Sequence, residues 1–131
     1  MSRTGRCLCG ETTATVEPIP SVQACHCDMC RTWGGGPMMT VPCKSATFDG
    51  PVRRYASSEH ADRGFCGTCG THLFYYARQA DIHAVPVGLL DDQSDLPFRA
   101  EIHVDERPGY YCFANETKQM TGAEFAAKFR G

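Results

Sequence analysis

Nine of the 131 residues are cysteines, and seven of the nine fall into three short clusters. The clusters are Cys7-Leu8-Cys9, Cys25-His26-Cys27-Asp28-Met29-Cys30 and Cys66-Gly67-Thr68-Cys69. The odd count, and an amino-terminal stretch with no apolar secretion segment, favour reduced thiols over a disulfide framework. Clustered, reduced thiols are typical metal ligands. Soft thiolates at this spacing favour zinc, with an iron–sulfur cluster as the minority alternative.

Two of the clusters each supply a pair of sulfurs. The two residues between Cys66 and Cys69 turn the chain so that both sulfurs can meet one ion. We place Cys7 and Cys9 on a strand, where residues two apart face the same side and Leu8 faces the other. Together the two pairs predict a closed four-cysteine site, and closed zinc sites of this kind are structural.

The middle cluster differs because Cys25, Cys27 and Cys30 offer three sulfurs and leave one tetrahedral position open. Three protein ligands with an open position are the pattern of catalytic zinc, and an exogenous thiol suits that position. His26 stands between two ligands, so we expect its side chain to point away from the metal. A fourth ligand from Cys43, from Cys112 or from one of the five histidines would instead close the site.

Length and composition limit the remaining possibilities. The chain is long enough for one domain, residues 1–131, and its 42% hydrophobic content is that of a folded protein. No apolar run approaches the roughly 20 residues of a membrane span, so no membrane partner is expected. Thirteen basic against fifteen acidic side chains give a net charge of −2, which argues against a nucleic-acid partner. Without a targeting signal, we expect a cytoplasmic location.

The segments around the clusters have the pattern of short strands bounded by Gly, Pro, Asp or Ser. Strands are expected at 12–16, 21–26, 37–41, 46–48, 52–55, 72–77, 82–87 and 98–104. A turn at Asp49-Gly50-Pro51 would join two of these ranges as a hairpin. In the last range, apolar side chains would face one side and Arg99, Glu101 and His103 the other.

One helix is expected at the end of the chain. Thr121 and Glu124 have the spacing of a capping box, and Phe125 and Phe129 would form an apolar stripe on one helix face. The fold class is therefore mainly β with a short C-terminal helix.

Four stretches carry motif residues in addition to the spaced cysteines. They are Cys7-Leu8-Cys9-Gly10, Cys25-His26-Cys27-x-x-Cys30-Arg31, Phe65-Cys66-x-x-Cys69-Gly70-x-x-Leu73 and Val87-Gly88-Leu89-Leu90-Asp91-Asp92. In this order they resemble the glutathione-dependent formaldehyde-activating enzyme family, which includes the centromere protein V type. The resemblance runs from about Cys7 to Tyr111. It implies a single, zinc-bound, β-tent-like domain with two zinc ions per chain. The structural zinc would bind Cys7, Cys9, Cys66 and Cys69, and the catalytic-type zinc would bind Cys25, Cys27 and Cys30.

The activity that the resemblance implies is carbon–sulfur lyase chemistry, in which formaldehyde and glutathione combine to give S-hydroxymethylglutathione or the adduct breaks down. The partner would be a small thiol such as glutathione. Trp33, Gly34 and Gly35 lie in a loop resembling the Gly-Gly-Pro loop of a bacterial subgroup, and we take them as candidate substrate contacts. Arg31 is a candidate for binding a glutathione carboxylate.

The chain departs from many relatives at two places near the expected substrate. It has Glu101 before Ile102 where relatives often carry a His, and Tyr110-Tyr111 near a position where they often carry a Trp. No general acid or base stands out, although Glu59, His60 and Glu101 are possible.

Two other functions remain open from the sequence. A non-catalytic zinc scaffold that binds a protein or a nucleic acid is the main alternative. A thiol or metal sensor is the second, because an open three-thiolate site is exposed to oxidants and soft metals. The sequence leaves the oligomeric state undetermined.

Overall fold

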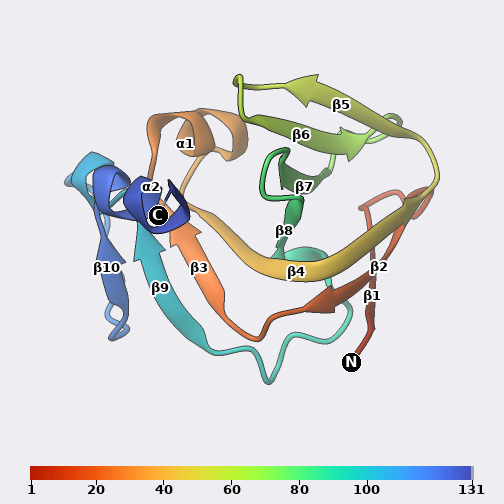
Figure 1. The fold of residues 1–131 in the computed structure, drawn as a ribbon. Helices are drawn as coiled ribbons and strands as arrows, with labels where there is room; N and C mark the ends of the chain where they lie inside the picture. The colour runs from red at the N-terminus through yellow and green to blue at the C-terminus, as the bar shows by residue number, and fades with distance from the viewer. Residues whose placement is uncertain (131) are drawn as a thin grey trace. The chain divides into compact units, whose positions relative to one another are not determined.

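The computed structural model describes residues 1–130, with side chains described up to Lys128, and the fold is mainly β with two short α-helices (Figure 1). The predicted fold class is therefore confirmed. The chain divides into two compact units, Met1–Pro20 with Thr40–Leu96 and Ser21–Met39 with Pro97–Gly131. The single domain over residues 1–131 stays a prediction.

The first unit is an antiparallel sheet in the order β1-β2-β4-β8-β7-β6-β5. Its strands are β1 (Arg3–Arg6), β2 (Thr13–Pro18), β4 (Met38–Asp49), β5 (Val52–Ala56), β6 (Ala61–Cys66), β7 (His72–Ala77) and β8 (Ile82–Pro86). A short 3₁₀ turn, η1 (Val87–Leu89), follows β8, where Pro86 ends the strand. The core consists of apolar residues from most of these strands, with Val41, Leu73, Phe74 and Val85 fully buried.

The predicted hairpin around Asp49-Gly50-Pro51 is wrong. The chain turns there, but residues 46–48 belong to the long strand β4, which pairs with β2 and β8. Strand β5 pairs with β6 instead. Turn residues predict where the chain changes direction. Which strand pairs with which depends on contacts between residues that are far apart in the sequence.

The second unit contains a small parallel sheet of β3 (Val22–Cys25), β9 (Phe98–Ile102) and β10 (Lys118–Met120). Strands β3 and β9 lie side by side in Figure 1, with Ala24 opposite Glu101 and Cys25 opposite Ile102. Helix α1 (Asp28–Gly34) follows β3, and the 3₁₀ turn η2 (Val104–Glu106) follows β9. This unit has its own apolar cluster around Cys25, Cys30, Ile102 and Met120.

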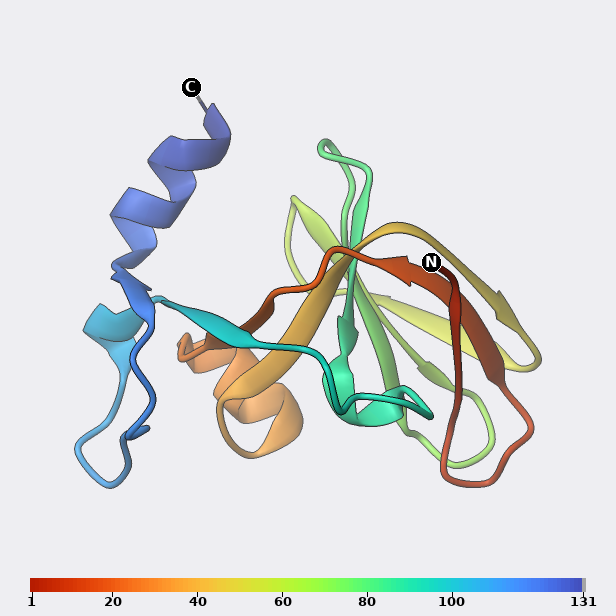
Figure 2. The same cartoon turned by 90° about the horizontal axis from the view of Figure 1, so that it is seen from below.

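Helix α2 (Gly122–Arg130) closes the chain directly after β10 (Figure 2). Its predicted capping box is confirmed: Glu124 N–H donates to the Thr121 hydroxyl at 3.1 Å, and Thr121 N–H donates to Glu124 Oε1 at 2.9 Å. Phe125 packs against the apolar cluster of the second unit. The side chain of Phe129 lies outside the described residues.

Two further expectations need correction. Helix α1, which carries Cys30, was not anticipated, because seven residues are too few to show a helical period. In β9 the predicted exposed polar face is wrong at Glu101, whose side chain is fully buried. The strand ends at Ile102, and His103 adopts a left-handed conformation with φ 55°.

Candidate metal centres

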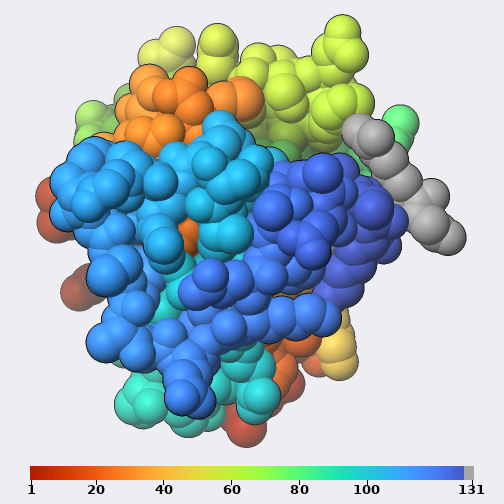
Figure 3. Space-filling model, turned by 90° about the vertical axis from the view of Figure 1, so that its left-hand side faces the viewer, coloured from red at the N-terminus to blue at the C-terminus, as the bar shows by residue number. Residues whose placement is uncertain are grey.

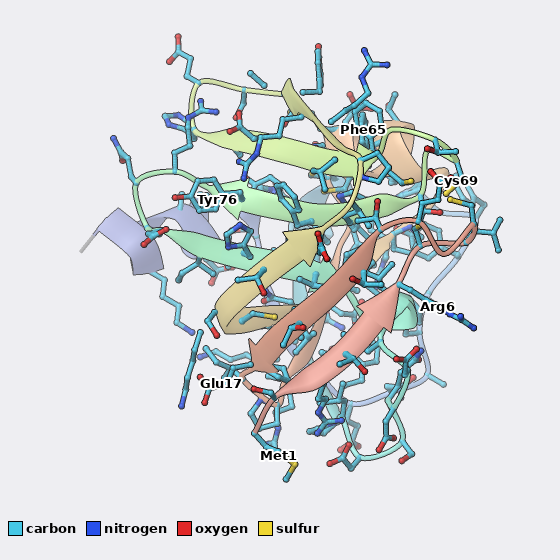
Figure 4. The ribbon with its side chains drawn as sticks, turned by 90° about the vertical axis from the view of Figure 1, so that its right-hand side faces the viewer. Met1, Arg6, Glu17, Phe65, Cys69 and Tyr76 are labelled. Carbon is cyan, nitrogen blue, oxygen red and sulfur yellow. The ribbon has the colours of Figure 1, made fainter. Side chains whose placement is uncertain are left out.

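The first candidate centre brings together Cys7, Cys9, Cys66 and Cys69, with their four sulfurs within 4.8 Å of one another. The Sγ atoms of Cys7 and Cys9 are 3.5 Å apart, and those of Cys9 and Cys66 are 3.9 Å apart. Thiolates bound tetrahedrally at about 2.3 Å from zinc lie roughly 3.8 Å apart, so the donor set fits this ion. Figure 4 shows Cys69 in the turn between β6 and β7, beside the loop that follows β1.

The two cysteine pairs lie in two similar turns. Gly10 N–H donates to Cys7 O at 3.1 Å, and Gly70 N–H donates to Cys66 O at 2.9 Å. Both glycines have φ near 81°, a left-handed conformation that residues with a Cβ adopt at a cost. Cys7 and Cys9 are therefore in a turn rather than on the predicted strand. Leu8 does face away, since 91% of its surface is exposed.

Hydrogen bonds stabilise the thiolate form of Cys66 and Cys69 in this cluster, whereas at Cys9 burial and hydrogen bonds with the other thiols outweigh the Glu11 backbone contact and raise the pKa to about 12. The Thr12 amide donates to Cys7 Sγ at 3.3 Å, and the Thr68 amide donates to Cys66 Sγ at 3.4 Å. Hydrogen bonds from the side chain and backbone of Thr71 lower the pKa of Cys69 to about 5. Such donors favour the deprotonated sulfur that binds a metal.

The second candidate centre brings together Cys25, Cys27 and Cys30, again with sulfurs within 4.8 Å of one another. Cys25 ends β3, and Cys27 is the N-cap of α1, where its Sγ accepts the Cys30 amide at 3.3 Å. The strand–helix junction thus places three sulfurs on one side of a tight turn. Cys25 and Cys30 are buried, whereas Cys27 is half-buried.

Within the described part of this unit, no fourth His, Cys, Asp or Glu donor joins the three sulfurs. Cys112 is exposed and separate from the group. Cys43 belongs to the core of the first unit, where its thiol donates to Val41 O. The three-cysteine centre therefore has the donor set of a site with one open position.

Charge is distributed unevenly among the three thiols. Hydrogen bonds from Cys25 and Cys30 lower the pKa of Cys27, and the same contacts raise the pKa of Cys25. Cys27 is thus the thiol of the three whose deprotonated form is favoured, and it is also the most exposed of them.

A hydrogen-bond network around the fully buried His26 and Glu101 adjoins this centre. His26 Nε2 is 2.8 Å from Glu101 Oε1, and His26 Nδ1 is 2.5 Å from the Tyr111 hydroxyl. Thr117 donates its hydroxyl to the other oxygen of Glu101 at 2.6 Å. With Glu101 ionised, Nε2 of a neutral His26 donates to the carboxylate and Nδ1 accepts from Tyr111. His26 is thus held on both ring nitrogens and points away from the metal position, as predicted.

Polar contacts from the segment after β9 and from α1 also fix the turn that carries the three cysteines. Glu106 accepts the Asp28 amide through Oε1 at 3.1 Å and contacts His103 Nδ1 through Oε2 at 3.1 Å. Arg31 donates Nε–H to the carbonyl oxygen of His26 at 3.0 Å. The loop that carries the three sulfurs is therefore held by side-chain hydrogen bonds at His26 and at Asp28.

Sequence reasoning missed Glu101, Tyr111 and Thr117 as supporting residues. The available signal was His26 itself, because a buried histidine between two ligands needs partners for both ring nitrogens. Those partners come from β9 and the segment after it, and strand register decides which residues reach the ring.

The predicted substrate contacts lie at the end of α1. Trp33 is half-buried, Gly34 is the last helical residue, and Gly35 is the C-cap with φ 85°. The Gly35 amide donates to Arg31 O at 2.8 Å, so the first two glycines of the loop end the helix. Their role toward a substrate stays a prediction.

Neither α-helix of the described chain has the length and apolar character needed to cross a membrane.

Comparison with known proteins gives consistent results. A curated protein of Schizosaccharomyces pombe, named an uncharacterized lyase, is 34% identical over 123 residues, which is 89% of this chain and 89% of the relative. The crystal structure of a Rhodobacter sphaeroides protein matches with a TM-score of 0.58 and 22% identity. That match covers 67% of this chain and 87% of the other, and it supports the fold alone.

The family described as glutathione-dependent formaldehyde-activating enzyme matches residues 2–106, a span that includes all seven clustered cysteines. Together with the lyase relative, this match supports a lyase-like function. The chain belongs to the glutathione-dependent formaldehyde-activating enzyme family.

Proposed function

We propose that this protein is a zinc-dependent carbon–sulfur lyase that forms or breaks the adduct of a small thiol and an aldehyde, with glutathione and formaldehyde as the type pair. The observation that carries the proposal is the three-cysteine group, which has no fourth donor among the described residues of its unit. A closed four-cysteine group in the other unit provides the contrast. The family and the lyase relative support the same chemistry.

The reaction needs no oxidant or reductant. The thiol sulfur attacks the aldehyde carbon, a C–S bond forms, and the carbonyl π pair moves to oxygen. The proton leaves sulfur and reaches that oxygen, and the reverse reaction breaks the same bond. A zinc ion at the three-cysteine centre would supply a position for the thiol sulfur and lower the pKa of the thiol.

The residues of the chain have separate roles in this proposal. Cys25, Cys27 and Cys30 hold the metal, and the buried pair of His26 and Glu101 fixes the loop that carries them. Trp33, Gly34 and Gly35 end helix α1 one turn after Cys30 and supply candidate contacts for the substrate. The loop is thus shaped before substrate binds, which lowers the entropic cost of bringing the reacting groups together.

The test compares two cysteine variants for metal content and turnover. Zinc is counted by elemental analysis, and exchange between free and adduct formaldehyde is followed by NMR with glutathione. Cys27→Ser is expected to lower zinc from two ions to one per chain and to lower catalysed exchange by about 100-fold or more. The matched control is Cys43→Ala, which removes a thiol that belongs to neither cluster.

The control should keep both zinc ions and its exchange rate. Wild-type exchange no faster than the uncatalysed rate, with two zinc ions bound, would refute the enzyme proposal and leave the scaffold function. Full exchange activity in Cys27→Ser would refute the role of the three-cysteine centre.

A further inference from the structure

His103 follows directly after β9, next to the turn that carries the three cysteines. Strand β9 pairs with β3 so that Ile102 lies opposite Cys25, and the His26 amide donates to Ile102 O at 3.1 Å. The backbone of His103 is therefore fixed beside the start of that turn. Its side chain is partly exposed.

The backbone conformation of His103 turns its ring toward the cysteine side of β9. In a regular strand its side chain would face the same side as Glu101, which binds His26. Its φ of 55° interrupts this alternation, and its ring lies 6.0 Å, centroid to centroid, from the ring of Phe125. Phe125 packs against the apolar cluster of the second unit, which includes two of the three cysteines. A residue with a Cβ adopts the left-handed conformation at a cost, and such residues gather at functional sites.

Glu106 joins the ring of His103 to the start of α1. Its Oε2 is 3.1 Å from His103 Nδ1, and its Oε1 accepts the Asp28 amide at 3.1 Å. Asp28 is the residue after Cys27, so one carboxylate links the imidazole to the Cys27 end of the turn. With Nδ1–H donated to Glu106, the second ring nitrogen, Nε2, carries a lone pair and can accept a proton.

Electrostatics also place His103 near the accessible thiol of the group. Hydrogen bonds from Cys25 and Cys30 lower the pKa of Cys27 most, and the positive charge of His103 lowers it further. Cys27 is the most exposed of the three cysteines. Figure 3 views the unit from a side on which light-blue residues after β9 form the surface and part of the orange β3–α1 region is visible between them.

The acid–base candidates named from the sequence have other surroundings. Glu101 is fully buried, and its two oxygens are bonded to His26 and Thr117. Glu59 and His60 are exposed in the turn between β5 and β6, in the first unit. The ring after β9, by contrast, is partly exposed and fixed beside the cysteine turn.

We propose that His103 is the catalytic acid–base residue of the thiol–aldehyde reaction and that Glu106 orients it. The inference rests on the proposed function, because it assigns the proton transfers of that reaction. His103 Nε2 takes the proton from the thiol, the sulfur attacks the aldehyde carbon, and the carbonyl π pair moves to oxygen. The imidazolium then gives the proton to that oxygen, so that the hydroxyl forms and His103 is neutral again. The reverse reaction takes the same steps in the opposite order.

The first experiment measures exchange between free and adduct formaldehyde by NMR, with the zinc-loaded protein and glutathione. His103→Asn is the test variant, because asparagine tolerates the left-handed conformation and its amide does not accept the proton. The matched control is His60→Asn, which removes an exposed histidine of the first unit. His103→Asn should lower the maximal rate by about 100-fold and keep the zinc content and the half-saturating glutathione concentration of wild type. The control should keep all three.

Added imidazole separates a chemical role of the ring from a structural one. His103→Gly removes the ring and suits the same backbone conformation. Imidazole in solution should therefore restore part of the maximal rate of this variant in a saturable manner, without accelerating wild type or the control. A rate of His103→Gly that imidazole leaves unchanged would overturn the proton-transfer role.

Thiol binding without aldehyde gives a readout that does not depend on turnover. Glutathione is titrated into the zinc-loaded protein while NMR follows the ring protons of His103, which are assigned by their absence from His103→Asn. The signals should move to the positions of a protonated imidazole as glutathione saturates. Ring signals that stay unchanged at saturation would refute His103 as the acceptor of the thiol proton.

The outcomes separate this role from the proposed function. If wild type catalyses exchange and His103→Asn is equally fast, the role of His103 is refuted and the lyase proposal stands. If wild type exchanges formaldehyde no faster than the uncatalysed reaction, the lyase proposal fails and the catalytic role of His103 fails with it.

Discussion

Glu101 offers the sharpest test of how the second centre is supported. Its carboxylate is fully buried and accepts hydrogen bonds from His26 at 2.8 Å and Thr117 at 2.6 Å. Glu101→Ala removes both acceptors and leaves a cavity, whereas Glu101→Gln keeps the shape. The neighbouring Glu116→Ala is the control, because Glu116 is exposed.

The expected free-energy changes follow from these contacts. In Glu101→Ala, the buried Nε2–H of His26 and the Thr117 hydroxyl each lose a partner, at about 1–3 kcal/mol each. Breaking a buried pair in this way costs about 3–5 kcal/mol in total. In Glu101→Gln the amide oxygen accepts from His26, and the amide NH₂ donates to Thr117 once its hydroxyl turns. Only the charge assistance is lost, so we expect about 1–2 kcal/mol.

Two assays read these variants. Urea unfolding at neutral pH with excess zinc gives the free energy of unfolding. In a matching thermal melt, Tm should fall by about 4 °C for each kcal/mol of lost stability. Chelator competition gives the zinc affinity of each centre. Because His26 is fixed between two ligands, Glu101→Ala should weaken zinc at the three-cysteine centre by about 10–100-fold and leave the four-cysteine centre unchanged.

Two results would contradict this role of Glu101. A Glu101→Ala protein as stable as Glu116→Ala would show that the network contributes nothing to folding. If Glu101→Ala lowers the free energy of unfolding but leaves the zinc affinity of both centres unchanged, the network supports the fold and does not orient the loop that carries the three cysteines.

Three further predictions address the first unit. Burial lowers the pKa of His72 to about 4, so the unfolded state binds the proton more readily and stability falls as pH drops from 6.5 toward 4. Between pH 7.5 and 5, wild type should lose about 2 kcal/mol more than His72→Gln in urea unfolding, and parallel curves would contradict this. A Cβ at Gly64 would lie 2.1 Å from the ring of Phe74, so Gly64→Ala should lower the free energy of unfolding by about 1–3 kcal/mol. Gly88 has open space around it, so Gly88→Ala should change the free energy of unfolding by less than about 0.5 kcal/mol. Cys9→Ser should lower zinc content by one ion and lower Tm strongly, since structural zinc contributes folding energy, and an unchanged Tm would contradict a structural role.

The cysteine grouping was predictable from the sequence because the signal is local. Each pair or triplet closes its own turn, so spacing constrained which sulfurs meet within a cluster, and the two pairs, each with only two sulfurs, were predicted to join in one four-cysteine group. The helix cap at Thr121 and Glu124 was predictable for the same reason. The strand β7 at His72–Ala77 matched its predicted bounds, since six aromatic and apolar residues stand between clear boundaries.

Strand partners and buried polar residues were not predictable in this way. The parallel pairing of β3 with β9 joins segments more than 70 residues apart, and it decides that Glu101 lies beside Ala24 and next to His26. A charged residue in an alternating strand predicts an exposed face, because burial of an unpaired carboxylate is costly. Glu101 is buried because three partners from elsewhere in the unit surround it: His26, Thr117 and, at longer range, Arg107.

The two departures from the usual family pattern are parts of one arrangement. Glu101 and Tyr111 bind opposite nitrogens of the same ring, that of His26. A carboxylate can only accept, and with Nε2 protonated the Nδ1 nitrogen needs a donor, which the Tyr111 hydroxyl supplies. A His at the first position can also accept through a ring nitrogen, and a Trp near the second can also donate through its indole N–H. An acceptor on Nε2 and a donor on Nδ1 are therefore the requirement, and several residue pairs meet it. The side chain on the Nδ1 side, Tyr111, also lines the surface hollow beside Arg107, so a change there alters this surface while any other donor would keep His26 in place.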